Sequence, residues 1–244
     1  MTAPLCRRLA AEAVGTGLLV AIVVGSGIQA AELSRDVGVQ LLANSLATVF
    51  GLAVLIALLG PVSGAHFNPA VTLAAWFTAR RKADGLTLRD AAVYMSAQIA
   101  GAVGGAVLAD AMFAKPLIKW SVTDRSTSNL WLGEVVATAG LVLLVFGLER
   151  VGRTSLAPAV VASYIGAAYW FTSSTSFANP AVTIGRAFTD TFAGIAPASV
   201  PPFVAAQLAG ALLGLGAVIG VYGRPTPSGE EVVVAHGERE PASS

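Results

Sequence analysis

The sequence contains little charge of either sign and a single cysteine. Only 12% of its 244 residues are Asp, Glu, Lys or Arg, and the mean hydropathy is +0.72, whereas soluble domains carry about 25% charged residues. This composition places the chain among membrane proteins. A formal net charge of +1 supplies no basic field, so we expect no nucleic-acid partner. The single cysteine, Cys6, excludes an intramolecular disulfide framework.

Patterns typical of catalysis are also missing from the sequence. Only two histidines occur, His66 and His236, and the second lies in the polar C-terminal tail. We find no set of metal ligands, no paired catalytic carboxylates and no Ser/His dyad in the chain. We therefore expect that the protein is not an enzyme and that it has no cofactor and no metal.

Apolar stretches of membrane length fill most of the chain. A helix needs about 20 apolar residues to span a bilayer, and we predict spans near residues 9–30, 38–60, 88–111, 130–148, 156–174 and 199–222. The charge-free runs 37–79 and 154–185 are too long for one span and too short for two spans with a loop. Each run contains Asn-Pro-Ala near its far end. We therefore predict that a re-entrant half-helix follows the full span, near 68–79 and near 179–189.

Lysine and arginine are distributed unevenly between the two sides of this topology. The predicted inner segments hold Arg7, Arg8, Arg80, Arg81, Lys82, Arg89, Arg150, Arg153, Arg224 and Arg239. The predicted outer segments hold only Arg35, Lys115, Lys119, Arg125 and Arg186. This bias predicts that both termini are cytoplasmic. We interpret residues 223–244, rich in Pro, Ser and Glu, as a disordered cytoplasmic tail, and the composition and short loops point to a bacterial inner membrane.

The chain contains two copies of one unit. The segment HFNPAVTLAAWFT at 66–78 matches FANPAVTIGRAFT at 177–189. Three spans per copy is an odd number, so the second copy enters the membrane from the opposite face, as in inverted-repeat transporters. We expect a first repeat at 1–112, an outer connecting loop at 113–129 and a second repeat at 130–222. The repeated ladders of small residues predict close helix packing: Ala97, Gly101, Gly105 and Ala206, Gly210, Gly214.

Each Asn-Pro-Ala motif is expected to begin a half-helix, because Asn is a preferred N-cap and Pro is favoured at the first helical position. A half-helix of about 11 residues is about 16 Å long, roughly half of the hydrocarbon core, so the two starts should meet near the midplane. Their positive dipole ends repel cations, and each Asn amide still has N–H groups for a solute oxygen. The predicted pore residues are Asn68, Pro69, Ala70, Asn179, Pro180 and Ala181.

These motifs are similar to those of a known family. The segment Ser-Gly-Ala-His-Phe-Asn-Pro-Ala-Val-Thr at 63–72, together with the second Asn-Pro-Ala at 179–181, resembles the signatures of the aquaporin/glycerol-facilitator (major intrinsic protein) superfamily. The resemblance covers 9–222 and implies an all-α membrane protein. The implied fold is an aquaporin-like right-handed bundle of six transmembrane helices plus two re-entrant half-helices in an inverted repeat. It also implies a homotetramer in membrane lipid that passively conducts small neutral solutes, with one pore per protomer.

The sequence departs from the family at the outer constriction of the pore. In most members an Arg follows the second Asn-Pro-Ala, whereas this chain has Val182. Counting from the motifs places Ala167 where water-selective members usually hold His, and Ser176 beside it. The same counting places Thr48 where an aromatic is common, with Phe50 as an alternative. The resemblance thus implies a small, uncharged selectivity filter made by Thr48, Ala167, Ser176 and Val182.

A filter without Arg, His and an aromatic is wider and has fewer hydrogen-bond donors. We therefore expect an aquaglyceroporin that admits glycerol-like polyols or neutral metalloid hydroxides, with the Arg contribution to proton exclusion lost. A bacterial aquaglyceroporin branch associated with arsenic-resistance genes is similar here, which points to trihydroxy-arsenic and methylated arsenicals. One alternative is a general water/glycerol facilitator without a metalloid role. Another class is a proton-coupled secondary transporter, which should carry charged residues at its helix breaks.

Four further polar side chains need an interpretation. Arg186 lies one helical turn beyond Val182, so it either substitutes partly for the missing Arg or bonds a loop carbonyl. Glu12 and Glu134 lie within spans; we interpret them as structural acceptors for the loops before each Asn-Pro-Ala, with proton coupling as the alternative. His66 either lines the cytoplasmic vestibule or ties down its loop.

Overall fold

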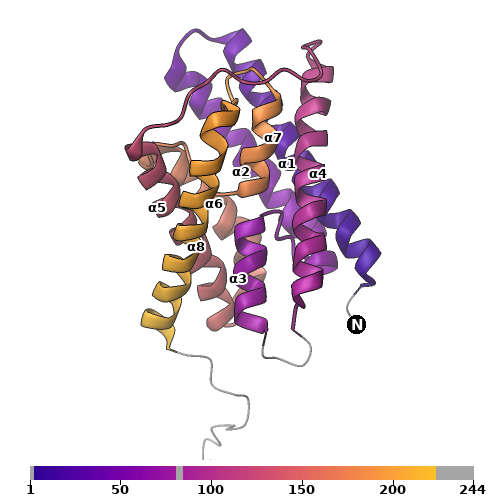
Figure 1. Cartoon of the computed structure of the whole chain (residues 1–244), viewed down its shortest axis with the longest axis vertical. Helices are drawn as coiled ribbons and strands as arrows, with labels where there is room; N and C mark the ends of the chain where they lie inside the picture. The colour runs from indigo at the N-terminus through magenta and orange to yellow at the C-terminus, as the bar shows by residue number, and fades with distance from the viewer. Residues whose placement is uncertain (1–2, 81–84, 224–244) are drawn as a thin grey trace, which may run out of the picture.

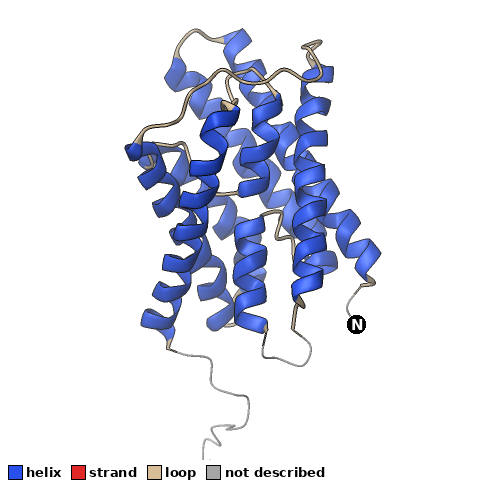
Figure 2. Cartoon of the chain, viewed as in Figure 1, coloured by secondary structure: helices blue, strands red, loops and turns tan. Residues whose placement is uncertain are grey.

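The computed structural model describes residues 3–80 and 85–223, and all regular elements within them are helices (Figure 2). The predicted all-α fold is therefore confirmed, while the predicted tail at 223–244 lies outside the described residues except for Gly223. The elements are α1 (Leu5–Leu33), α2 (Val37–Ser63), α3 (Pro69–Ala79), α4 (Leu88–Met112), α5 (Ser128–Arg150), η1 (Thr154–Leu156), α6 (Ala157–Phe171), α7 (Pro180–Gly185), η2 (Arg186–Phe188), η3 (Pro197–Ser199) and α8 (Val200–Tyr222).

Five of these helices are long and apolar enough to cross a membrane: α1, α2, α4, α5 and α8 together with η3. The sixth predicted span, 156–174, is shorter than expected, because α6 has 15 residues and the chain becomes extended at Thr172. Its length is about 22 Å, and the preceding turn η1 adds about 6 Å, which together approach the thickness of a hydrocarbon core. The early end of α6 leaves the following residues free to enter the re-entrant loop.

The two half-helices lie end to end inside the bundle, with α3 below and α7 above in Figure 1. Each contacts long helices of both halves of the chain: α3 packs on α4 and α8, and α7 packs on α4 and α8 as well. The second half-helix differs from its prediction at 179–189, because its α-helical part ends at Gly185 and continues as the 3-10 turn η2. At Gly185 an added Cβ would lie 2.7 Å from the backbone oxygen of Ala102 in α4, so the turn fits closely against that helix.

The predicted small-residue ladders are confirmed as packing faces. A Cβ added to Gly101 or Gly105 of α4 would lie 2.1 Å from the carbonyl oxygen of Ala13 or 2.0 Å from that of Gly17, both in α1. In the second half, α8 approaches α5 in the same way, with Gly210 and Gly214 against the carbonyls of Val135 and Ala139. The long helices therefore pack backbone to backbone, as small-residue motifs allow in membranes.

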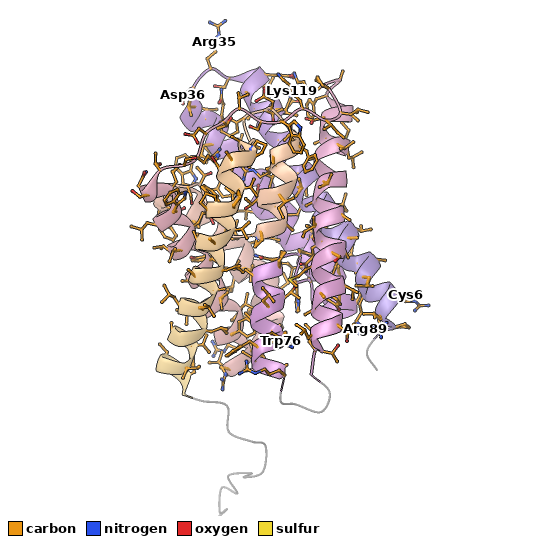
Figure 3. The ribbon with its side chains drawn as sticks, viewed as in Figure 1. Cys6, Arg35, Asp36, Trp76, Arg89 and Lys119 are labelled. Atoms are coloured by element: carbon orange, nitrogen blue, oxygen red, sulfur yellow. The ribbon has the colours of Figure 1, made fainter. Side chains whose placement is uncertain are left out.

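Both ends of the described chain lie toward the lower end of the bundle in Figure 1. In Figure 3, Cys6 and Arg89 lie near that end, whereas Arg35, Asp36 and Lys119 lie at the opposite end. The segment between α4 and α5 crosses the upper end, where the Lys119 amide donates to the Phe188 carbonyl at 3.0 Å. This segment therefore lies directly over the second half-helix.

The α1–α4 contact gives a direct test of the packing. We expect Gly105→Ala to destabilise the protein by about 1–3 kcal/mol, because the added methyl group overlaps the Gly17 backbone. The neighbouring change Gly104→Ala is the control, since nothing lies within 4 Å of its added Cβ. Thermal unfolding of the detergent-solubilised protein measures both variants, and equal melting temperatures would contradict the packing.

Candidate functional site

The two asparagines cap the half-helices that they precede. Asn68 is extended, and its side-chain oxygen accepts a hydrogen bond from the Ala70 amide at 2.9 Å. The Asn179 side-chain oxygen accepts from the Ala181 amide at 3.0 Å and from the Val182 amide at 3.2 Å. A proline follows each asparagine at the first helical position, where its missing N–H costs nothing.

The nitrogen of each asparagine side chain crosses to the other half of the chain. Asn68 Nδ2 donates to the carbonyl oxygen of Ala178 at 2.7 Å, and Asn179 Nδ2 donates to that of Phe67 at 2.7 Å. Each amide group carries two N–H donors, so one is used in this exchange and one remains. Both asparagines also line the central cavity, where the remaining donor is available to a solute oxygen.

The loops before the asparagines adopt left-handed backbone conformations at non-glycine residues. The φ angles are 49° at Ala65 and 47° at Phe67 in the first loop, and 51° at Ser176 and 47° at Ala178 in the second. Such conformations cost L-residues roughly 1–2 kcal/mol each. They leave the carbonyls of Phe67 and Ala178 within reach of the opposite asparagine, while the amides of the same residues bond elsewhere.

In the first loop, the backbone amides of His66 and Phe67 bond to the buried carboxylate of Glu12. Its Oε1 accepts from the Ser63 hydroxyl at 2.6 Å and the His66 amide at 3.0 Å. Its Oε2 accepts from the Phe67 amide at 2.7 Å and from Gln98 Nε2 at 2.8 Å. One carboxylate thus pairs two amides that would otherwise be buried without partners in the non-helical loop.

Glu134 has the same surroundings in the second half. It accepts from the Phe177 amide at 2.9 Å, the Ala178 amide at 2.8 Å and Gln207 Nε2 at 2.5 Å. Neither Glu134 nor Glu12 lines the central cavity. Both carboxylates are occupied by loop donors away from the path of a solute, which favours the structural interpretation over proton coupling.

Two glutamines link these acids to the half-helices. Gln98 Nε2 also donates to the Thr72 hydroxyl at 2.9 Å, and Gln207 Nε2 donates to the Thr183 hydroxyl at 2.8 Å. Each threonine lies in the first turn of its half-helix. The acid, the loop and the helix start therefore form one connected polar network in each half.

A cavity of about 880 Å³ runs past the meeting point of the half-helices. Arg8, Asp90 and Tyr94 border its inner end, and Thr48 and Val182 border its outer end. Between them the walls are mainly apolar stripes with four-residue spacing along the helices, such as Ala157, Val161, Ile165 and Tyr169 of α6. Hydrogen-bonding groups are therefore concentrated at the asparagines and at the two ends.

The structure places the two candidates for one predicted filter position on different sides of α2. Thr48 lines the cavity and is 2% exposed, whereas Phe50 is 68% exposed on the outer surface of the bundle. Two residues correspond to about 200° around a helix, so only one of the pair can face the cavity. Ser176 and Val182 also line the cavity, as expected.

The structure corrects the predicted position of Ala167. This residue is exposed and does not line the cavity, and Tyr169 of the same helix lines it instead. The count back from Asn179 crosses the non-helical residues 172–178 before it reaches α6, so a fixed offset does not identify which residue of the helix faces the cavity. The four-residue stripe that begins at Ala157 would have pointed to Tyr169.

The hydroxyl groups at the outer end have defined hydrogen-bonding roles. The Thr48 hydroxyl donates to the Asn44 carbonyl at 2.8 Å, so in its 3.1 Å contact with the Tyr169 hydroxyl the tyrosine is the donor. The Tyr169 oxygen keeps its acceptor capacity. The Ser176 hydroxyl is buried without a hydrogen-bond partner among the described residues. The outer end of the cavity therefore has the acceptor of Tyr169 beside the apolar Val182.

Arg186 and His66 also line the cavity. Arg186 is 4% exposed, its Nε donates to the Ala193 carbonyl, and its guanidinium carbon lies 3.4 Å from the centre of the Phe177 ring. His66 Nδ1 lies 3.1 Å from the Thr72 hydroxyl, and its backbone amide bonds to Glu12. Each of the two side chains thus borders the cavity and is tied to its surroundings, and the substitution of Arg186 for the missing filter Arg stays a prediction.

Comparisons with known proteins agree with this geometry. Residues 1–177 match the family model of the major intrinsic protein. The chain is 51% identical over 211 residues to aquaglyceroporin AqpS of Rhizobium meliloti, covering 86% of this chain and 88% of that protein. It is 30% identical over 273 residues to the glycerol uptake facilitator protein of Pseudomonas aeruginosa, covering 96% and 95%. The X-ray structure of the aquaglyceroporin from Plasmodium falciparum has the same fold, with a TM-score of 0.64, 21% identity and coverage of 89% and 97%.

A helical bundle with two half-helices that meet beside one long cavity defines a multi-pass membrane channel. The chain belongs to the major intrinsic protein family. Both the expected family and the expected aquaporin-like fold are confirmed.

Loss of one loop acceptor tests the polar network. We expect Glu134→Gln to lower the free energy of unfolding by about 1–3 kcal/mol, because the amide places a donor against loop donors and leaves one unpaired. Chemical denaturation in detergent measures the change. The exposed acid Glu32, paired only with Lys115 at the outer end, provides the control variant Glu32→Gln, and a larger loss in the control would contradict the role of Glu134.

Proposed function

We propose that this channel passively conducts small uncharged hydroxylated solutes, namely glycerol-like polyols and neutral metalloid hydroxides such as trihydroxy-arsenic. The observation that carries the proposal is the uncharged constriction formed by Thr48, Tyr169, Ser176 and Val182 at the outer end of the cavity. Val182 occupies the position where most family members carry the filter Arg. The names of the Rhizobium aquaglyceroporin and the Pseudomonas glycerol uptake facilitator support a solute larger than water.

The polar groups of the cavity match the chemistry of a hydroxyl group, which both donates and accepts. The Tyr169 oxygen accepts a hydrogen bond from a solute O–H. Val182 contacts the apolar side of the solute. Farther in, the remaining N–H donors of Asn68 and Asn179 replace the next hydrogen bond that the solute loses from water.

Two alternatives remain distinct from this proposal. A general water/glycerol facilitator without a metalloid role would share the pore and differ only in its solutes. A proton-coupled transporter is disfavoured, because the helix breaks carry neutral asparagines and the carboxylates of Glu12 and Glu134 lie outside the cavity.

The same proposal includes the topology and assembly. We assign the first repeat to 1–112, the outer loop to 113–129 and the second repeat to 130–222, in a homotetramer of a bacterial inner membrane with both termini cytoplasmic. The position of both described ends at one end of the bundle supports this orientation (Figure 1). Exposed apolar side chains along α2, including Phe50, Val54 and Leu58, supply a surface for lipid or neighbouring protomers.

The uncharged constriction is tested by Val182→Arg. We expect uptake of glycerol and of arsenite into proteoliposomes to fall at least about fivefold, because the long charged side chain narrows the opening. Val182→Ala is the matched control and should conduct at least as well as the unaltered protein. Equal uptake by the Arg variant and the unaltered protein would refute the filter argument, and uptake of glycerol without arsenite would favour the general facilitator.

The corrected filter position is tested by Tyr169→Phe. Loss of one acceptor worth about 0.5–1.5 kcal/mol should lower the ratio of glycerol to water permeability about two- to tenfold. Ala167→Ser, on the exposed side of the same helix, should leave the ratio unchanged. Stopped-flow swelling and shrinking of proteoliposomes gives both permeabilities. If only the Ala167 variant altered the ratio, the original offset would be right and Tyr169 would have no role in selectivity.

A further inference from the structure

Two arginines lie against one aromatic ring at the outer end of the cavity. The guanidinium carbon of Arg186 lies 3.4 Å from the centre of the Phe177 ring, and that of Arg125 lies 4.9 Å from it. Only Arg186 lines the cavity, together with Phe177 itself and the filter residues Ser176 and Val182. We propose that Arg186 supplies the positive charge that excludes protons and metal cations from this pore. This inference rests on the proposed function, because it concerns the same constriction.

Arg186 is held in place from two directions. Its Nε donates to the Ala193 carbonyl, and the ring of Phe177 covers its guanidinium plane, a contact that stabilises a cation by its electrostatic attraction to the ring face. Phe177 is itself fixed, because its amide bonds to Glu134 at 2.9 Å and its ring packs edge to face on Phe203 at 5.3 Å. The charge therefore keeps a defined position beside the cavity.

The charge of Arg186 is not cancelled by an ion pair within the described residues. The salt bridges found there join Arg8 to Asp90, Lys115 to Glu32 and Lys119 to Asp190. Glu134, which holds the loop that carries Phe177, is engaged by loop donors and lies outside the cavity. The guanidinium groups of Arg186 and Arg125 both lie against the Phe177 ring, so two positive charges are close together at this point of the wall.

The terminal nitrogens of Arg186 are available as hydrogen-bond donors. Within the part of the chain that the structure describes, only Nε of this guanidinium donates a hydrogen bond to the protein. The terminal N–H groups are thus left for solute oxygens or water in the cavity that Arg186 borders. A guanidinium stays charged at neutral pH, and its field is strong in a narrow site of low dielectric constant. A neutral solute gains a hydrogen-bond donor from the guanidinium, whereas a cation is repelled by its positive charge.

Arg125 provides a matched control on the same ring. Its Nε donates to the Gly194 carbonyl at 3.1 Å and its amide donates to the Ser199 hydroxyl at 2.9 Å, so it fastens the outer loop without reaching the cavity. If the cation near Phe177 served only to stabilise the fold, loss of either arginine should have similar consequences. If the charge acts on the permeant, only Arg186 should matter for ion exclusion.

The experiment measures ion leak and neutral flux in the same proteoliposomes. Proton entry is driven by a potassium diffusion potential and is measured with a pH-sensitive dye inside the vesicles. Sodium entry is measured with a tracer, and glycerol permeability is measured from the swelling of the vesicles. We expect Arg186→Gln to raise proton or sodium entry per protein at least about tenfold, and its glycerol permeability shows that the variant still forms a pore. Arg186→Lys should retain most of the exclusion, and Arg125→Gln should not leak. Adding Val182→Arg to Arg186→Gln should restore exclusion.

Three results would overturn the inference. The first is an Arg186→Gln variant that conducts glycerol and excludes ions as the unaltered protein does. The second is an equal leak from Arg125→Gln, which would remove the need for a charge at the cavity. The third is proton or sodium conduction by the unaltered protein, a result that does not require any variant to fold.

If the proposed function is wrong, the flux and ion measurements give a different set of results. An unaltered protein that passes neither glycerol nor arsenite would refute the proposed solutes. The ion measurements would still decide the role of Arg186, because a leak that appears in Arg186→Gln and is absent from Arg186→Lys follows the charge and not the glycerol flux.

Discussion

The reciprocal hydrogen bonds between the two asparagines and the opposite loops are the constraint on which the rest of the structure depends. Each asparagine uses its oxygen to begin its own half-helix and its nitrogen to hold the loop of the other. Neither half-helix can shift without losing a bond in both halves. The backbone contacts of α4 with α1 and of α8 with α5 bring the surrounding helices close enough to enclose this junction.

That arrangement requires non-helical backbone deep inside a membrane protein, and the chain meets the cost with polar groups of its own. Left-handed residues turn the Phe67 and Ala178 carbonyls toward the asparagines, which leaves the amides of the loops facing away from the cavity. Glu12 and Glu134 accept those amides, and a buried carboxylate is tolerable in turn because several donors surround it. Glu12 and Glu134 themselves therefore stay out of the cavity lining.

The features predicted correctly from sequence are those set by local chemistry or by repetition: the capped half-helices, the packing ladders and the paired glutamates. Positions that depend on a loop length were harder. The prediction named Ala167 where the structure has Tyr169 at the cavity, because the count from Asn179 crosses a loop. Thr48 and Phe50 could be separated by helical phase alone. The stacking of Arg186 on Phe177 was beyond reach, because it also needs the carbonyl of Ala193, which returns to the half-helix through an irregular loop.

The position of Arg186 suggests how one pore can be wide and still selective against charge. An arginine directly after the second Asn-Pro-Ala both narrows the opening and repels cations. Arg186 begins four residues farther along, about 6 Å away on a helix, and its guanidinium is held against the Phe177 ring at the cavity wall. Coulomb repulsion declines only as 1/r, from about 4 kcal/mol at 4 Å to about 1.7 kcal/mol at 10 Å with an effective dielectric constant of 20. Val182 and Arg186 thus separate two tasks that a single residue usually combines, so that a larger neutral solute passes a constriction that a cation still finds unfavourable.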